Sequence, residues 1–157
     1  MSMSRFARKP APAASREAIR AALAEVRAVY AELDDRPVER ACTRLTECCQ
    51  FKRTGLMPSV TRGEALLALQ ALRATGRKGL PPAQNGACPM LDGLTGKCLV
   101  YADRPFGCRT HFCRAAGGPY ARRDVLDLIR RLEAVNDALG DYDGPKPFLS
   151  ALEAVGG

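Results

Sequence analysis

Apolar side chains recur at helical spacing near the start of the chain. Their intervals are four, three, four and three residues, which places them on one stripe of a helix that packs against another element. The stripe consists of Ile19, Leu23, Val26, Tyr30 and Leu33. Ser15 supplies a hydroxyl that caps the first turn. Because Pro37 disfavours a helical conformation in the residue before it, the pattern predicts that the helix ends near Asp34 and Asp35.

A second helix is predicted after Thr61 by a capping signal. The Thr61 hydroxyl serves one unpaired amide of the first turn, and Glu64 reaches back to another. The apolar side chains on the expected buried side are Leu66, Leu69 and Leu72. Gly76 suits the C-terminal end, because glycine readily adopts the left-handed conformation that follows many helices.

A third helix is predicted beyond Gly118 and Pro119. Its apolar face consists of Val125, Leu128, Ile129, Leu132, Val135 and Leu139. These positions repeat every three or four residues, and Gly140 marks the end of the helix. Residues 141–147 are expected to form a loop, and residues 148–155 a short terminal helix.

Frequent Gly and Pro interrupt the helical pattern over residues 79–119. Within this insert, residues 87–91 and 97–101 are predicted to form two short strands joined by the loop 92–96. In that hairpin Met90 lies opposite Cys98, which makes Cys88 a diagonal neighbour of Cys98 at about 7–8 Å. The predicted fold class is mainly α: a small helical domain with an irregular cysteine-rich insert that contains a short β-hairpin.

The chain has 157 residues, of which 46% are hydrophobic, and this suits one compact domain with a buried core. No apolar run reaches the roughly 20 residues that a membrane-spanning helix needs, so no membrane is expected as a partner. Residues 1–14 carry basic residues and prolines and lack the apolar stretch of a secretory signal. We expect a disordered basic tail there, followed by a single domain over residues 15–157, in the reducing cytoplasm.

The net charge of +7 is concentrated in one part of the chain. Residues 40–118 hold 12 basic and four acidic residues, and this window coincides with the cysteines. Two interpretations are open: the basic residues bind a polyanion, or they stabilise a site that several thiolates make negative. Nucleic acid is the less favoured partner, because no signature of a nucleic-acid-binding fold accompanies the charge. A polyanion would dock through Arg44, Lys52, Arg53, Arg77 and Lys78.

Seven cysteines carry the strongest functional signal. They are Cys42, Cys48, Cys49, Cys88, Cys98, Cys108 and Cys113. An odd number cannot pair completely within one chain, and a disulfide between the adjacent Cys48 and Cys49 would be strained, because their Cα atoms are only about 3.8 Å apart. In a reducing compartment such a set indicates metal or redox chemistry. All seven thiols are therefore candidate metal ligands, whereas no catalytic residue stands out.

The order of these motifs resembles a known family. The elements are Cys42, Cys48-Cys49, Cys88-Pro-Met-Leu, Gly96-Lys97-Cys98-Leu-Val-Tyr101 and Arg104-Pro105-x-x-Cys108-Arg109. Over residues 42–113 they resemble the zinc/iron-chelating cysteine-cluster family, whose opening motif is Cys-x2-Cys-x2-Cys-Cys. The resemblance implies that the thiols bind an iron–sulfur cluster or zinc, and a related module occurs in bacterial flagellin lysine methylases. Leu45 stands where the second cysteine of the opening motif belongs, so the family's set of thiols is incomplete here.

Spacing leaves the metal open between zinc and iron. Structural zinc sites use cysteine pairs separated by two to four residues, and only Cys108 and Cys113 have that spacing. A [4Fe-4S] cluster also takes four thiolates and tolerates dispersed ligands more readily, so we favour it over zinc, with metal-free thiol chemistry as a third interpretation. His111 is either a ligand or a packed side chain. Arg104 and Arg109 either hydrogen-bond to sulfurs and ligating carbonyls or are solvated.

The sequence therefore predicts a cytoplasmic metal-binding protein that holds an iron–sulfur cluster, or zinc, and serves electron transfer or redox sensing with an unidentified protein partner. Whether it is an enzyme stays open, because no phosphate-cradling glycine motif, nucleotide fingerprint or deaminase pattern is present. One alternative is a small oxidoreductase or methyl-transfer partner, which needs a substrate pocket next to the metal. The other is a zinc-stabilised module that binds a polyanion or a protein.

Overall fold

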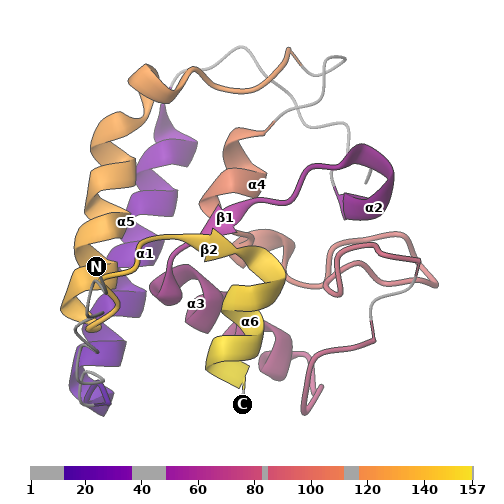
Figure 1. The fold of residues 1–157 in the computed structure, drawn as a ribbon, viewed down its shortest axis with the longest axis horizontal. Helices are drawn as coiled ribbons and strands as arrows, with labels where there is room; N and C mark the ends of the chain where they lie inside the picture. Colours follow the sequence, from indigo (N-terminus) through magenta and orange to yellow (C-terminus); the bar gives the residue numbers. More distant parts are fainter. Residues whose placement is uncertain (1–12, 37–48, 83–84, 112–116, 157) are drawn as a thin grey trace, which may run out of the picture.

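The computed structural model of the chain describes residues 13–36, 49–82, 85–111 and 117–156. Its fold is mainly helical with one small antiparallel sheet, which confirms the predicted fold class (Figure 1). The elements are α1 (Arg16–Asp35), α2 (Phe51–Thr54), β1 (Ser59–Val60), α3 (Arg62–Ala74), the 3-10 helix η2 (Tyr101–Asp103), α4 (Phe106–Thr110), the 3-10 helix η4 (Arg122–Asp124), α5 (Leu126–Ala138), β2 (Lys146–Pro147) and α6 (Phe148–Gly156). The basic tail expected over residues 1–14 lies almost wholly outside the described residues.

Helix α1 begins and ends where the sequence predicts. The side chain of Ser15 accepts a hydrogen bond of 3.1 Å from the amide of Ala18, and the helix stops at Asp35. Four of the five predicted stripe residues are buried, and the fifth, Ile19, is half-buried. The helical spacing therefore identified the face that packs on the rest of the molecule.

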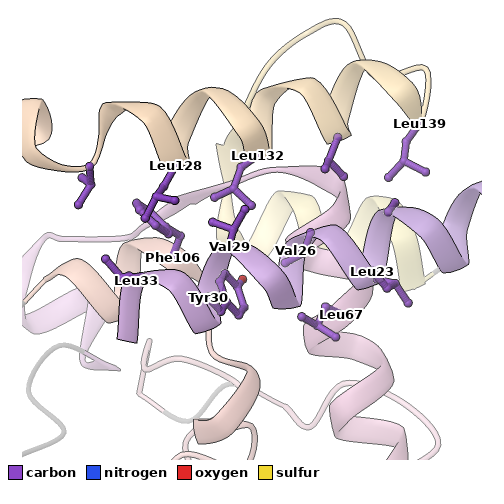
Figure 2. Close-up of a cluster of buried hydrophobic side chains, with 13 residues drawn as sticks. Leu23, Val26, Val29, Tyr30, Leu33, Leu67, Phe106, Leu128, Leu132 and Leu139 are labelled. Carbon is purple, nitrogen blue, oxygen red and sulfur yellow. The ribbon is translucent and has the colours of Figure 1, made fainter. Parts of the chain in front are cut away.

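The first core cluster lies where α1 packs against α5 and α3 (Figure 2). Its buried members are Ala22, Leu23, Val26, Val29, Tyr30, Leu33, Leu67, Phe106, Val125, Leu128, Leu132, Val135 and Leu139. Figure 2 shows Val29 of α1 close to Leu132 of α5. The same two helices are joined at the surface by ion pairs.

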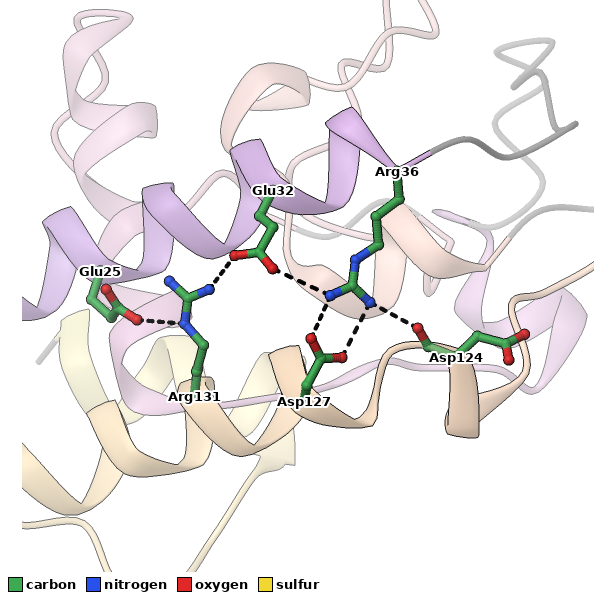
Figure 3. A network of polar contacts seen from close by, with 6 residues as sticks. All are labelled: Glu25, Glu32, Arg36, Asp124, Asp127 and Arg131. Atoms are coloured by element: carbon green, nitrogen blue, oxygen red, sulfur yellow. Dashed lines mark hydrogen bonds and ion pairs between the residues drawn. The ribbon is translucent and has the colours of Figure 1, made fainter.

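The surface network between α1 and α5 centres on Arg36 and Arg131 (Figure 3). The Arg36 guanidinium pairs with Asp127 and, at 3.3 Å, with Glu32, and it donates 2.8 Å to the Asp124 carbonyl. Arg131 pairs with Glu32 and, at 2.7 Å, with Glu25. The network links the two helices along their exposed edge, beside the buried cluster that packs them together.

Helix α3 has the predicted capping box and two buried faces rather than one. Thr61 and Glu64 make both reciprocal bonds of the box, and Gly76 follows the helix with φ of +88°. Leu69 and Leu72 are buried as predicted, but Leu66 is only half-buried. Leu67, which the prediction omitted, belongs to the first cluster, whereas Leu69 and Leu72 belong to a second cluster on the other side of α3.

The second core cluster joins α3 and α6 to the cysteine insert. Its buried members are Phe51, Val60, Ala65, Ala68, Leu69, Leu72, Cys88, Met90, Val100, Phe148, Ala151 and Leu152. Strands β1 and β2 pair antiparallel, with Ser59 opposite Pro147 and Val60 opposite Lys146. This pairing was not predicted, because strands of two residues are too short to show an alternating pattern, and 146–147 had been expected to lie in a loop.

The predicted hairpin is reduced to one antiparallel bridge, between Leu91 and Cys98. Between the same two segments, the amide of Leu99 donates a 2.8 Å hydrogen bond to the carbonyl of Met90. The predicted register, with Met90 opposite Cys98, is therefore wrong by one residue. The reason is a turn within the first predicted strand. There the Leu91 amide donates a 3.0 Å hydrogen bond to the Cys88 carbonyl, so residues 87–91 are not extended.

The two C-terminal helices, α5 and α6, are confirmed, but α5 begins later than predicted. A 3-10 turn over Arg122–Asp124 comes before α5, whose regular turns begin at Leu126. Gly140 follows α5 with φ of +76°, and α6 covers the predicted terminal helix. These helices complete the frame on which the cysteine insert lies.

Candidate metal centre

Four of the seven candidate ligands lie within the described residues: Cys49, Cys88, Cys98 and Cys108. Cys88 is buried, and the other three are half-buried. Cys42, Cys48 and Cys113 lie outside the described residues, as does Leu45. The site can therefore be built here only from the four described thiols and the segments that carry them.

Cys49 and Cys88 are brought together by their backbones. The amide of Cys88 donates 2.7 Å to the carbonyl of Cys49, and the amide of Lys52 donates 3.1 Å to the carbonyl of Gly86. Gly86 has φ of +69°, and a Cβ atom there would lie 2.5 Å from the Cβ atom of Lys52. Only glycine fits this close approach, in which residues 86–88 lie directly against residues 49–52.

Cys98 joins them through the bridge to Leu91. Cys88 is a buried member of the second cluster, and Cys49 and Cys98 pack against that cluster with partial burial. Three thiols that are far apart in the chain thus lie along one apolar surface, formed by α3 and α6 and by the insert itself. The prediction that Cys88 and Cys98 share a face rested on the register that is wrong, so their convergence on one ion or cluster stays a prediction.

Cys108 lies on α4, the short helix that follows Arg104 and Pro105. Its amide donates 2.9 Å to the carbonyl of Pro105. A Cβ atom on Gly107 would lie 2.9 Å from the Cβ atom of Pro58, so α4 packs closely on the residue just before β1. Cys108 is therefore carried by a different element than the other three thiols.

Arg109 is buried rather than solvated, and its donors are used within the fold. The guanidinium donates 2.9 Å to the Arg104 carbonyl and 3.1 Å to the Asp34 carboxylate, and it donates to the Ala102 carbonyl. It also lies 4.2 Å from the centroid of the Tyr30 ring. Because the side chain is buried, the interpretation of Arg109 as a solvated residue is wrong, and these contacts hold α4 against α1 and the preceding turn.

Arg104 is half-buried and contacts Tyr101, three residues earlier in the same motif. Its guanidinium donates 3.0 Å to the Tyr101 carbonyl and lies 4.0 Å from the centroid of the Tyr101 ring. The run from Tyr101 to Arg109 is therefore a folded unit in which each arginine fixes the backbone on which Cys108 is carried.

Glu64 makes more contacts than the capping box predicted from the sequence. Its carboxylate accepts 2.8 Å from the Thr61 amide, as the capping box requires, and also 2.8 Å from the Phe106 amide and 3.2 Å from the Tyr30 hydroxyl. Burial raises the pKa of Glu64, while the hydrogen bonds from Thr61, Phe106 and Tyr30 oppose that rise. Burial, and then the charge of Glu64, raise the pKa of Tyr30 well above its usual value.

The remaining sequence candidates are His111 and the basic residues of the polyanion interpretation. His111 is half-buried at the end of α4, where its amide donates 3.1 Å to the Gly107 carbonyl. Lys52, Arg77 and Lys78 are exposed. Arg44 lies outside the described residues, and so does the side chain of Arg53.

A cleft of about 300 Å³ lies between β1, α4 and α5. Phe106, Gly107 and Thr110 line it from α4, and Glu64 lines it from α3. No cysteine of the described ranges is among its lining residues. This cleft is therefore not the substrate pocket next to the metal that the oxidoreductase alternative needs.

The donor chemistry fits zinc or iron, since both take thiolates. Within the described part of the chain, however, no three His, Cys, Asp or Glu side chains form a group that could hold a metal ion. The described thiols are therefore a partial donor set. Cys42, Cys48 and Cys113, beyond the described ranges, are the remaining thiols of the chain.

The described residues form a small helical fold with thiols packed against an apolar cluster, which are the features of a candidate cysteine-cluster metal-binding protein. The comparison with known families is specific: the model of the CxxCxxCC domain, a proposed zinc- or iron-chelating domain, matches residues 40–126, and the chain belongs to this family. No curated protein and no solved structure matches the chain significantly. No helix in the described residues is long and apolar enough to cross a membrane.

Proposed function

We propose that the protein holds one iron–sulfur cluster, of the [4Fe-4S] type, through four of its cysteines, as a cytoplasmic redox or electron-transfer protein. The observation that carries this proposal is the packing of Cys49, Cys88 and Cys98 on one apolar cluster, with Cys88 hydrogen-bonded to Cys49 and Cys98 bridged to Leu91 through the backbone. Zinc at the same thiols is the alternative metal.

The dispersion of the thiols supports a cluster over a single zinc ion. Cys49 and Cys88 meet through long-range backbone pairing rather than through a short Cys-x-x-Cys turn, which is the usual source of zinc ligands. A cluster is bulkier than one ion and accepts ligands from separate segments. The apolar surroundings of Cys88 also suit a cluster, because they limit access of water.

The proposed ligands among the described residues are Cys88, Cys98 and Cys108, each of which stands in a family motif. The fourth is drawn from Cys49, Cys48 and Cys42, and Cys113 is expendable because it lies beyond the last motif. When bound, the cluster supplies one-electron chemistry. The chain's own residues hold the thiols in place, and the apolar cluster shields Cys88 from water.

Metal analysis of protein purified without oxygen tests the proposal. We expect about four iron and four sulfide per chain, with the absorption and paramagnetic resonance of a [4Fe-4S] cluster. Stoichiometric zinc without iron or sulfide would establish the alternative metal and overturn the cluster. Absence of both metals from protein with intact thiols would overturn metal binding itself.

Single cysteine variants test the ligand assignment. Cys98→Ala should lose the metal, whereas Cys113→Ala, the matched change at a cysteine outside the motifs, should keep it. The opposite result would show that the assignment is wrong. The protein's fold can be monitored in parallel by circular dichroism, so that loss of a ligand is separated from loss of structure.

A further inference from the structure

The helix that carries Cys108 is too short to be stable alone. Helix α4 spans Phe106–Thr110, which is 5 residues. Isolated helices need about 12–15 residues to be even marginally stable in water. The position of Cys108 must therefore be set by contacts between α4 and the rest of the molecule.

The first of these contacts is made by Glu64, from the first turn of α3. One carboxylate oxygen accepts from the Phe106 amide at the start of α4 and from the Tyr30 hydroxyl of α1. The other accepts from the amide and the hydroxyl of Thr61. Each oxygen thus has two donors, and this fully buried side chain ties α1, α3 and α4 to one point.

The second contact is made by Arg109, the residue after Cys108. Its side chain is only 5% exposed, whereas that of its partner Asp34 at the end of α1 is 63% exposed. The guanidinium also bonds to two carbonyls of the preceding turn and stacks on Tyr30. A planar guanidinium with five donors can make this set of contacts at once, and a lysine cannot.

We propose that Glu64 and Arg109 are positioning residues that fix α4, and with it Cys108, in its ligand position before any metal is bound. The inference deepens the proposed function, on which it rests for the role of Cys108 as a ligand. Neither residue is among the proposed ligands. Both act through the helix, at its first amide and at its last turn.

Preorganisation is the physical reason for the effect on metal binding. A ligand held in place does not lose further conformational freedom when the metal binds, so the affinity is higher. Changes to residues that orient metal ligands typically cost about 10- to 100-fold in affinity. Loosening α4 should therefore weaken the metal and expose the Cys108 thiol in the metal-free protein.

Asp34→Asn is the most conservative test, because Asp34 is exposed and the change keeps its size. Asp35→Asn removes the same charge at the next, exposed position and is the matched control. Zinc affinity is measured by competition with a chelator, and alkylation of each cysteine in the metal-free protein is measured by mass spectrometry. We expect Asp34→Asn to weaken zinc about 10-fold and to accelerate alkylation of Cys108 but not of Cys88.

Arg109→Lys and Glu64→Gln should show the same selective pattern more strongly, with zinc weakened about 10- to 100-fold. A purely structural role would instead accelerate alkylation at all four described cysteines equally and would overturn the proposal. The proposal would also be overturned if Asp34→Asn had the zinc affinity and the Cys108 alkylation rate of the wild type. This test remains decisive even if Arg109→Lys and Glu64→Gln fail to fold. If wild-type protein binds neither zinc nor iron, the proposed function fails, while the alkylation rates still decide the positioning role.

Discussion

The amide of Cys88 donates a 2.7 Å hydrogen bond to the carbonyl of Cys49. The bond joins backbone atoms, so the approach of these two cysteines does not depend on their side chains. It depends on how closely the two segments can lie, and that is set by the residue at position 86. The candidate metal site is therefore sensitive to a position that bears no proposed ligand.

Gly86→Ala should separate the two segments. A Cβ atom at this position would lie 2.5 Å from the Lys52 Cβ atom, which is close to the backbone and cannot swing away. Gly96→Ala is the matched control, because Gly96 has a similar φ of +66° but nothing within 4 Å of the added atom. We expect the free energy of unfolding to fall by about 1–3 kcal/mol more in Gly86→Ala than in the control. Equal losses in denaturant titrations would mean that the close approach contributes nothing.

Acid should weaken the joint between α1 and α5. The hydrogen bond from Arg36 lowers the pKa of Asp127 in the folded state. The ionised carboxylate therefore stabilises the folded state above the ordinary aspartate pKa of about 3.9. This contribution is lost as the pH falls through the lower pKa of the folded state. Asp127→Asn should lower the melting temperature near neutral pH and make little difference well below that pKa. The effect should be small, since the carboxylate is exposed.

Asp137→Asn serves as the control for this pH dependence, because it removes an exposed carboxylate from the same helix. Its melting temperature should follow the wild-type dependence on pH. If Asp127→Asn also follows the wild-type curve over the whole range, the Arg36 pair does not contribute to stability.

Removal of metal should loosen the insert more than the helical frame. Residues 79–119 hold few large apolar side chains, and Leu94 at the tip of the insert is 98% exposed, so binding of metal supplies part of the folding free energy there. We expect amide hydrogen exchange to rise over residues 88–108 after chelation and to stay unchanged in the middle of α5. Unaltered protection over 88–108 would count against a metal-dependent insert.

Leu45→Cys should restore the missing cysteine of the opening motif. If that position faces the metal, as the motif implies, the variant should change the metal stoichiometry or the spectrum of a cluster. Leu56→Cys, at an exposed leucine, introduces a thiol without that placement and should leave both unchanged. Identical metal content and spectra in wild type and Leu45→Cys would show that the motif has been placed in the wrong register.

Local signals predicted the helical frame well, and contacts between distant segments account for what was missed. The capping box of Thr61 and Glu64 was identified because both bonds lie within four residues. The further bond from the Phe106 amide to Glu64 crosses 42 positions and leaves no trace in local spacing. Leu67 was omitted for a related reason: a single apolar stripe was expected on α3, whereas the helix separates two clusters.

The candidate site was predictable in composition but not in geometry. The motif order identified the cysteines, and the family match over residues 40–126 supports a metal-chelating domain. The arginines of the last motif could not be assigned from sequence, since a buried and a solvated arginine have the same local pattern. Only the positions of Asp34 and Tyr30, at the far end of α1, show why Arg109 is buried.

Helix α6 follows the cysteine insert along the chain, yet Phe148, Ala151 and Leu152 form part of the apolar cluster that buries Cys88. Because synthesis runs from the N-terminus, the four described cysteines leave the ribosome before this part of their support exists. A nascent chain that has not reached Phe148 lacks part of the apolar cover of Cys88. The order of the segments therefore means that the surroundings of this thiol are complete only after α6 has been made.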